Sequence, residues 1–383
     1  MRRVLAAVAA LAVAMSTALA GSAGAVADAA ANTSGRWRVV DGPQPGAWSY
    51  LADVTALSPT DAWAVGEYGK PPPALRSLTL IEHWDGSTWT TAPSPSPPSR
   101  YGAGFSAVLA LAPNDVWAAG SSAGKVGDRT LIEHWDGSAW SVVPSPSPGA
   151  SDDLYDLMSS GSNGSLWAVG STQPTYGGEN APLVEEWNGS RWKVVPAQDP
   201  PGGASLYGGA AVSANDAWVV GEASGAGDQS LAEHWDGTSW SIVPTPGGDP
   251  DSSLDEVAAV TTSDVWAVGE GSLCAIIERW DGNQWSLVPA PRSSGVTLNG
   301  VAARSATSAW AVGERSRFGN RVTTRTERWN GAGWSVVGSP NGTFAESNLL
   351  AVAVVPGSKQ TWAVGISTPV DGSTAASLIE LYS

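Results

Sequence analysis

Acidic side chains occupy one equivalent position in three of the seven repeats of this 383-residue sequence. Each lies two residues after the first leucine of an alternating apolar run: Asp53, Asp156 and Glu256. The matching positions of the other repeats hold only small residues: Ala107, Gly208, Gly300 and Ala351. Three crowded carboxylates could bind a cation such as Ca²⁺ or share a proton for acid–base catalysis. The alternative is that they point into the contacts between repeats, or into water.

Aromatic residues cluster near the starts of the same apolar runs, and a further carboxylate, Asp255, adjoins Glu256. The aromatic residues are Trp48, Tyr50, Tyr101, Tyr155 and Tyr207. Aromatic faces stack on sugar rings, and carboxylates bond to sugar hydroxyls, so this combination suits a glycan. Aromatic residues at strand ends also serve in ordinary packing, which is the alternative.

Arginines crowd into the sixth repeat of an otherwise acidic chain: Arg304, Arg315, Arg317, Arg321, Arg325 and Arg328. We expect Arg315, Arg317, Arg321 and Arg325 to share one loop, where they could dock an acidic partner or an anionic glycan. A solvated loop that balances nearby carboxylates is an equal alternative.

Residues that recur in the repeat indicate scaffold rather than chemistry. His83, His134 and His234 share one position in different repeats, so they would lie too far apart around a ring to bind one metal. A glutamate precedes that position in all seven repeats, which predicts a structural fastener that accepts hydrogen bonds from a neighbouring repeat: Glu82, Glu133, Glu185, Glu233, Glu278, Glu327 and Glu380. No catalytic motif is present, so we assign no catalytic residue, and any metal site is unknown.

The element that must position these residues is a tryptophan-centred repeat of about fifty residues. Its W-A-V-G motif, or a close variant, recurs at intervals of 44 to 54 residues: Trp63, Trp117, Trp167, Trp218, Trp266, Trp310 and Trp362. Period-2 alternation and β-branched residues predict four short strands per unit, and Asp-Gly or Asn-Gly turns join the last two. This period indicates an all-β, seven-bladed β-propeller with four-stranded antiparallel blades.

The seventh unit ends at Ser383 without its fourth strand. Residues 35–40, G-R-W-R-V-V, match the fourth strand S-R-W-K-V-V at 190–195. We therefore expect the N-terminal strand to complete the last blade, in a 3+1 closure that leaves the ring no open edge.

Composition and the N-terminus bound the protein's setting. Residues 1–25 read as a secretory signal peptide and 26–34 as a short flexible lead, with the propeller spanning 35–383. The formal net charge of −16 disfavours nucleic acid and anionic membranes as partners. The single cysteine, Cys274, excludes a disulfide within the chain, and we expect it to be buried. We predict a secreted, extracellular monomer with no membrane span.

The blade length and the placement of glycine and tryptophan in the repeat resemble the kelch and galactose-oxidase-like propellers. The pattern is also similar to propeller proteins secreted by actinobacteria. This resemblance covers about residues 35–383 and implies the fold rather than an activity. A copper oxidase is not expected, because the three histidines are dispersed.

Two functions of different class fit these observations. The first is an extracellular binding or scaffold protein that recognises a glycan or a protein on the face with the variable loops, without a cofactor. The second is a polysaccharide-active hydrolase or lyase that uses Asp53, Asp156 or Glu256. Convergence of these carboxylates on one pocket would favour the enzyme. A purely structural surface protein is a third possibility.

Overall fold

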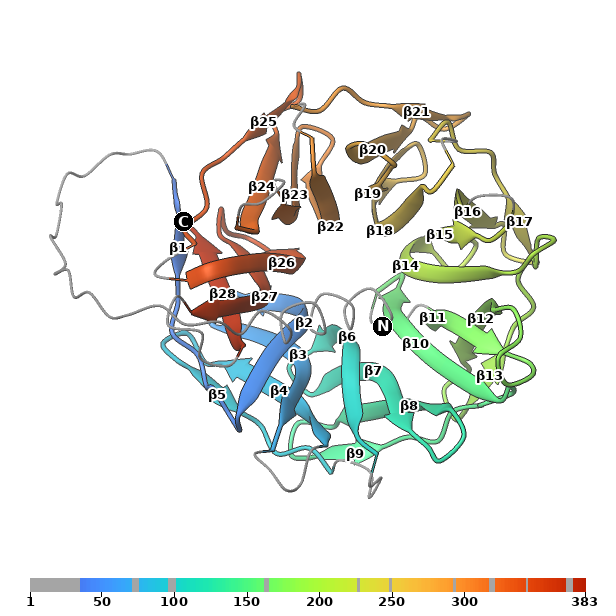
Figure 1. Ribbon diagram of the computed structural model, residues 1–383, viewed down its shortest axis with the longest axis horizontal. Helices are drawn as coiled ribbons and strands as arrows, with labels where there is room; N and C mark the ends of the chain where they lie inside the picture. Colours follow the sequence, from blue (N-terminus) through green and yellow to red (C-terminus); the bar gives the residue numbers. More distant parts are fainter. Residues whose placement is uncertain are drawn as a thin grey trace, which may run out of the picture.

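The computed structural model describes residues 35–70, 76–95, 101–161, 165–225, 228–247, 250–291, 294–316, 321–341, 344–369 and 375–383. Within these ranges every regular element is a strand, and 28 strands form seven four-stranded antiparallel sheets. Figure 1 shows the sheets arranged as blades around a central axis. The chain is a seven-bladed β-propeller, as predicted. The proposed signal peptide and lead lie outside the described residues.

Six blades run outward from the axis in chain order, and the seventh takes its outer strand from the N-terminus. The inner strands are β2 (Trp48–Ser58), β6 (Ala103–Ala112), β10 (Ser151–Ser159), β14 (Ala204–Ser213), β18 (Ser253–Thr261), β22 (Val296–Ser305) and β26 (Phe344–Val354). The second strands are β3 (Asp61–Gly69), β7 (Asp115–Ala123), β11 (Leu166–Gln173), β15 (Asp216–Ala223), β19 (Asp264–Glu270), β23 (Ser308–Arg315) and β27 (Thr361–Pro369). The third strands are β4 (Ser77–Trp84), β8 (Asp128–Trp135), β12 (Ala181–Trp187), β16 (Gln229–Trp235), β20 (Ala275–Trp280), β24 (Thr323–Trp329) and β28 (Ala376–Tyr382). The outer strands are β5 (Trp89–Thr91), β9 (Trp140–Val142), β13 (Trp192–Val194), β17 (Trp240–Ile242), β21 (Trp285–Leu287), β25 (Trp334–Val336) and β1 (Trp37–Val39).

The turns define two faces of the ring. The connections between first and second strands and between third and outer strands share one face, here called the lower face. At the lower face Gly86 adopts a φ of +97°, and Asp85 Oδ1 accepts hydrogen bonds from the backbone N–H groups of Ser87 and Thr88. This side-chain-capped turn explains the recurrence of Asp-Gly and Asn-Gly. The opposite, upper face carries the longer connections and the starts of the inner strands.

The hydrophobic core lies between neighbouring blades rather than within one blade. Trp63 on β3 is 3% exposed and packs against Trp135 and Trp140 of the next blade, with ring centroids 5.4 and 5.5 Å away. The same three-ring arrangement recurs at every blade junction. Aromatic pairs of this kind contribute about 0.5–1.5 kcal/mol each beyond their buried area. Packing of the recurring tryptophans therefore stabilises the junctions between blades, which contain no disulfide.

The seventh blade is composite. β1 pairs antiparallel with β28, in the register Trp37↔Tyr382, so the sheet order is β1-β28-β27-β26. Trp37 packs edge-on against Trp310 of the sixth blade at 5.1 Å, and Tyr382 takes the place that a third tryptophan fills elsewhere. In Figure 1 the C-terminus lies beside β1. The N-terminal strand thus completes the last blade, as the sequence predicted.

The recurring glutamate of the third strands is at most 1% exposed in every blade. In the second, fourth and seventh blades it accepts hydrogen bonds from the segment that leaves the preceding blade. Ser94 Oγ, after β5, donates to Glu133 at 2.9 Å. Ser339 Oγ, after β25, donates to Glu380 at 2.6 Å. These contacts confirm the predicted fastener role where they occur.

The histidines lie near the lower face, as structural partners of aspartates. His83 Nε2 is 3.0 Å from Asp61 Oδ1, and the imidazole packs on Trp63 at 4.2 Å. His134 and His234 make the same contact with the aspartate that begins their second strand. The prediction for Cys274 was wrong, because this residue is exposed in the loop before β20. No helix in the described ranges is long and apolar enough to cross a membrane.

Candidate functional site

Residues near the starts of all seven inner strands, which lie toward the upper face, line a cavity of about 1000 Å³. Ten carboxylates line it: Asp53, Asp128, Asp153, Asp156, Glu222, Asp228, Asp255, Glu256, Glu270 and Glu314. Four tyrosines and four amides join them: Tyr50, Tyr155, Tyr176, Tyr207, Gln173, Asn180, Asn299 and Asn348. The cavity therefore presents polar and aromatic groups to whatever enters it.

A β-bulge in each inner strand shapes this wall. In β2 the register shifts between Leu51 and Asp53, so Ala52 is an extra residue that turns toward the axis. The same shift occurs in all seven inner strands. The extra residues all line the cavity and differ between blades: Ala52, Ser106, Tyr155, Tyr207, Asp255, Asn299 and Leu350. The same β-bulge in every blade thus presents a different side chain to the cavity.

Sequence reasoning missed part of this ring, although a signal for it was present. The glycine of the W-A-V-G motif lies opposite the bulge, where a Cβ on Gly66 would stand 2.1 Å from the Tyr50 carbonyl oxygen. A glycine inside a strand indicates a bulge or a close backbone approach. The residue after that glycine was also missed, and as Glu222, Glu270 and Glu314 it lines the cavity.

The three repeat-breaking carboxylates all line the cavity, and each is fixed by backbone hydrogen bonds. Asp156 Oδ1 accepts from the N–H of Leu157 at 2.7 Å, and Oδ2 accepts from Gly209 of the next blade at 2.7 Å. Glu256 Oε1 accepts from Val257 at 2.8 Å. The bulge places each carboxylate so that it faces the lumen while it is held by the strands behind it.

The protonation of these carboxylates is strongly perturbed. Burial raises the pKa of Asp53 to about 7, although hydrogen bonds from Val108 and Val54 lower it. Burial, followed by the charge of Asp53, raises the pKa of Asp156 well above its usual value. The pKa of Glu256 rises for the same reason, with Asp156 as the main charged neighbour. Their mutual repulsion shows that the fold brings these carboxylates into electrostatic contact.

The tyrosines of the third and fourth blades form one aromatic wall. Tyr155 and Tyr207 have ring centroids 5.7 Å apart with planes inclined at 53°. The Tyr207 hydroxyl donates to Glu222 Oε1 at 2.6 Å, and the Tyr155 hydroxyl lies 3.1 Å from Ser171 Oγ. These hydrogen bonds orient the rings at the lumen, so the wall is preorganised.

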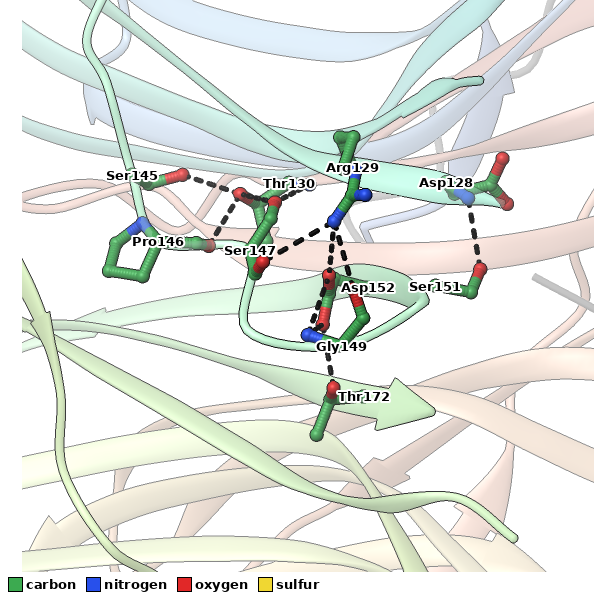
Figure 2. A network of polar contacts seen from close by, with 10 residues as sticks. All are labelled: Asp128, Arg129, Thr130, Ser145, Pro146, Ser147, Gly149, Ser151, Asp152 and Thr172. Carbon is green, nitrogen blue, oxygen red and sulfur yellow. Dashed lines mark hydrogen bonds and ion pairs between the residues drawn. The ribbon is translucent and has the colours of Figure 1, made fainter. Parts of the chain in front are cut away.

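A buried polar network fixes the rim between the second and third blades (Figure 2). Asp152 is fully buried, and its Oδ1 accepts hydrogen bonds from Thr172 Oγ1 at 2.6 Å and from the Gly149 N–H at 2.9 Å. Arg129 Nη1 lies 3.5 Å from Asp152 Oδ2 and donates to the Gly149 carbonyl at 2.9 Å. The loop after β9 is thereby held against β10.

The same network reaches the cavity wall itself. The backbone N–H of Asp128 donates to Ser151 Oγ at 3.0 Å, and both residues line the cavity. The rim between these blades is therefore braced by side chains on both of its sides.

Two predicted aromatic residues lie outside the cavity wall. Trp48 stacks on Tyr50, with ring centroids 6.5 Å apart, and does not itself line the cavity. Tyr101 is 43% exposed and lies away from the lumen.

The expected arginine cluster lies partly outside the described residues, and the placement of Arg325 on its loop was wrong. Arg325 lies within β24 rather than on a loop, is 7% exposed and bonds Glu327 Oε1 at 2.6 Å. Arg304 donates instead to the carbonyls of Val355 and Gln360. Of the remaining loop residues, Arg315 ends β23, Arg321 is exposed, and Arg317 lies outside the described residues. Sequence spacing predicted a single loop for these arginines, but Arg315 belongs to β23 and Arg325 to β24.

A Ca²⁺ site at the carboxylates was one expectation. In the part of the chain that the structure describes, no group of three or more His, Cys, Asp or Glu side chains is arranged to hold a metal ion.

Comparisons with known proteins support the fold alone. No family model matches the chain, and no curated protein matches it. The structure titled "YCF48 bound to D1 peptide" is similar, with a TM-score of 0.57, 16% identity, and coverage of 92% of this chain and 98% of that one. U3-55K gives a TM-score of 0.60 at 11% identity, with coverage of 91% and 98%. A GH74 xyloglucanase from Xanthomonas campestris gives 0.53 at 12% identity, with coverage of 90% and 55%. The kelch and galactose-oxidase resemblance stays a prediction.

Proposed function

We propose that this propeller is an exported, non-catalytic binding protein that receives a glycan or a segment of another protein in its central cavity. The observation that carries the proposal is the ring of bulge residues, which varies on a wall that is otherwise repeated. Variable side chains on a rigid, concave scaffold are typical of ligand sites. Export rests on the apolar N-terminus, and a monomer is proposed with it.

Two further observations support binding over catalysis. Both oxygens of Asp53 and of Asp156 accept backbone hydrogen bonds, which leaves these carboxylates little freedom to act on a substrate. One structural neighbour, YCF48, is titled with a bound peptide, so a propeller of this shape can serve as a binder.

Turnover of a polysaccharide is the second candidate, and one observation favours it. Burial and the charge of neighbouring acids raise the pKa of Asp156 and of Glu256, so either could serve as the protonated general acid of a glycosidase. A GH74 xyloglucanase is among the neighbours of this fold. If turnover occurs, Asp156→Asn and Glu256→Gln will abolish it while binding is retained.

The test is a glycan array and a peptide library probed with the wild type and with Tyr155→Ser/Tyr207→Ser. Serine suits this position because Ser106 occupies the same bulge in the second blade. We expect the affinity of the double variant for its ligand to fall by about tenfold or more, while its melting temperature stays close to that of the wild type. Tyr101→Ser is the matched control outside the cavity. Equal binding by all three proteins would refute a cavity site.

A further inference from the structure

The cavity wall holds acidic side chains and, among its described lining residues, no basic ones. Ten carboxylates line the cavity, whereas no lysine, arginine or histidine is among its described lining residues. The lower face differs, because there Asp264 pairs with the guanidinium of Arg279 at 2.7 Å. At the rim, Arg129 is engaged by Asp152. The fold thus pairs acidic groups with basic ones outside the lumen and lines the lumen with acidic groups alone, of which burial keeps Asp156 and Glu256 protonated.

A second feature of the wall is an amide that presents an unused donor. Asn348 on β26 is 9% exposed and lines the cavity. Its Oδ1 accepts a hydrogen bond from Asn299 Nδ2 at 2.8 Å. Its own Nδ2 donates to no other residue within the described chain. Asn348 lines the cavity, so a bound ligand can accept a hydrogen bond from this Nδ2 in place of water.

We propose that the cavity binds an extended cationic peptide, whose lysine or arginine side chains enter the acidic lumen while a backbone carbonyl accepts a hydrogen bond from Asn348 Nδ2. This inference rests on the proposed function and specifies its ligand. Opposite charge across a desolvated cavity strengthens each ion pair, and the negative field speeds the approach of a cation. The same field repels anionic glycans.

A peptide fits the pair of features better than a simple amine does. The ionised carboxylates favour positive charge, and Asn348 Nδ2 offers a hydrogen bond to an acceptor at a fixed place on the wall. A basic peptide supplies both, because each residue carries a carbonyl beside its side chain. The cavity of about 1000 Å³ has room for several residues. The tyrosine wall adds faces on which guanidinium or aliphatic stems can pack.

The test measures the affinity of the full chain for fluorescent hexalysine, for a neutral N-acetylglucosamine oligomer and for its deacetylated, cationic form. The cavity variant is Asp228→Asn/Glu314→Gln, which replaces two lining acids with isosteric amides. The control is Asp41→Asn/Glu186→Gln, which makes the same replacements at residues outside the lining. Each titration is repeated at low and high salt, and melting temperatures confirm that the variants are folded.

We expect hexalysine to bind, and the cavity variant to weaken it about tenfold while the control changes it less than twofold. Asn348→Ala should weaken it as well, without a change in net charge. Equal weakening by cavity variant and control would overturn the proposal, since any acidic surface would then suffice. Binding of the neutral oligomer alone would overturn the cationic ligand and leave the cavity as a binding site. Tighter binding of the deacetylated oligomer than of hexalysine would overturn the peptide. Absence of binding by every probe would count against both the inference and the proposed function.

Discussion

Asp53 Oδ2, on the inner strand of the first blade, accepts a hydrogen bond of 2.8 Å from the backbone N–H of Val108 in the second blade. Its other oxygen accepts from Val54 at 2.7 Å. Asp156 in the third blade makes the equivalent contact with the backbone N–H of Gly209 in the fourth blade. Asp53 and Asp156 therefore join neighbouring blades by hydrogen bonds and also form part of the cavity wall.

Replacement of Asp53 by alanine should destabilise the ring. The Val108 N–H would lose its acceptor at a part-buried position, which costs about 1–3 kcal/mol. Chemical denaturation gives the free energy of unfolding directly. Asp41→Asn, at an exposed residue, is the control for the loss of charge. An Asp53→Ala protein as stable as the wild type would show that the hydrogen bond between Val108 and Asp53 does not stabilise the fold.

The fold could be predicted from the sequence because its determinants repeat. A tryptophan at each W-A-V-G, a turn glycine and a buried glutamate recur, so one unit's pattern is checked by the others. The composite blade followed because residues 35–40 match a strand that the last unit lacks. Cys274 and Arg325 were misplaced because neither belongs to the repeat, and single residues carry no such check.

The candidate site could be predicted only in part. Asp53, Asp156 and Glu256 were found because they depart from the small residues at their position. Ser106, Asn299 and Leu350 were missed, since a bulge inserts a residue and alternation then assigns the wrong face. The bulges in all seven inner strands together determine which side chains face one another across the cavity. A short stretch of sequence cannot predict this arrangement.

The stability of the ring should fall as pH rises from about 5 to above 8. Burial raises the pKa of six recurring glutamates to about 7 or 8: Glu82, Glu133, Glu185, Glu233, Glu278 and Glu380. Each holds a proton in the folded state that it has released in the unfolded state. Such a group stabilises the fold fully below its unfolded pKa, and this contribution is lost as pH rises through the folded value.

Thermal melts across this range test that expectation, and we expect the melting temperature to drop by about 5 °C or more. The range stays above the region where Asp85 and its equivalents titrate, because hydrogen bonds lower the pKa of Asp85 to about 2. A melting temperature that is flat or rises toward pH 8 would contradict the assignment of these glutamates as neutral in the fold.

Glu82→Gln should remove part of this pH dependence. Both Glu82 side-chain oxygens are buried, and neither has a hydrogen-bond partner among the described residues. A neutral amide of the same shape avoids the cost of ionisation, so the variant should match the wild type near pH 5 and exceed it above pH 8. Melting curves at the two pH values decide the matter. Greater stability at pH 5 alone would reverse the sign and refute the explanation.

Loss of Trp37 should open the ring at its closure. This side chain is 4% exposed and contacts Trp310 and Tyr382. Trp37→Ala should cost about 3–5 kcal/mol, and Trp37→Phe should cost less because it keeps an aromatic face. Denaturation curves measure both. Removal of residues 31–40 should destabilise the whole propeller, and an unchanged transition after that deletion would show that three strands suffice for the last blade.

Gly208→Ala should disturb both stability and the cavity wall. Gly208 occupies the post-bulge position of β14, where an added Cβ would stand 2.8 Å from Glu256 Cα and 2.9 Å from Glu256 Oε1. The Cα belongs to the backbone of β18, so the clash requires the two blades to separate, at a cost of about 1–3 kcal/mol. Gly300→Ala is the matched control, because its nearest atom, Ala351 Cα, is 3.1 Å away and the strain should be smaller. Denaturation gives the two costs, and titration with a cavity ligand shows whether Glu256 has moved. If both variants lose the same stability, the close approach at Gly208 does not limit how tightly these blades pack.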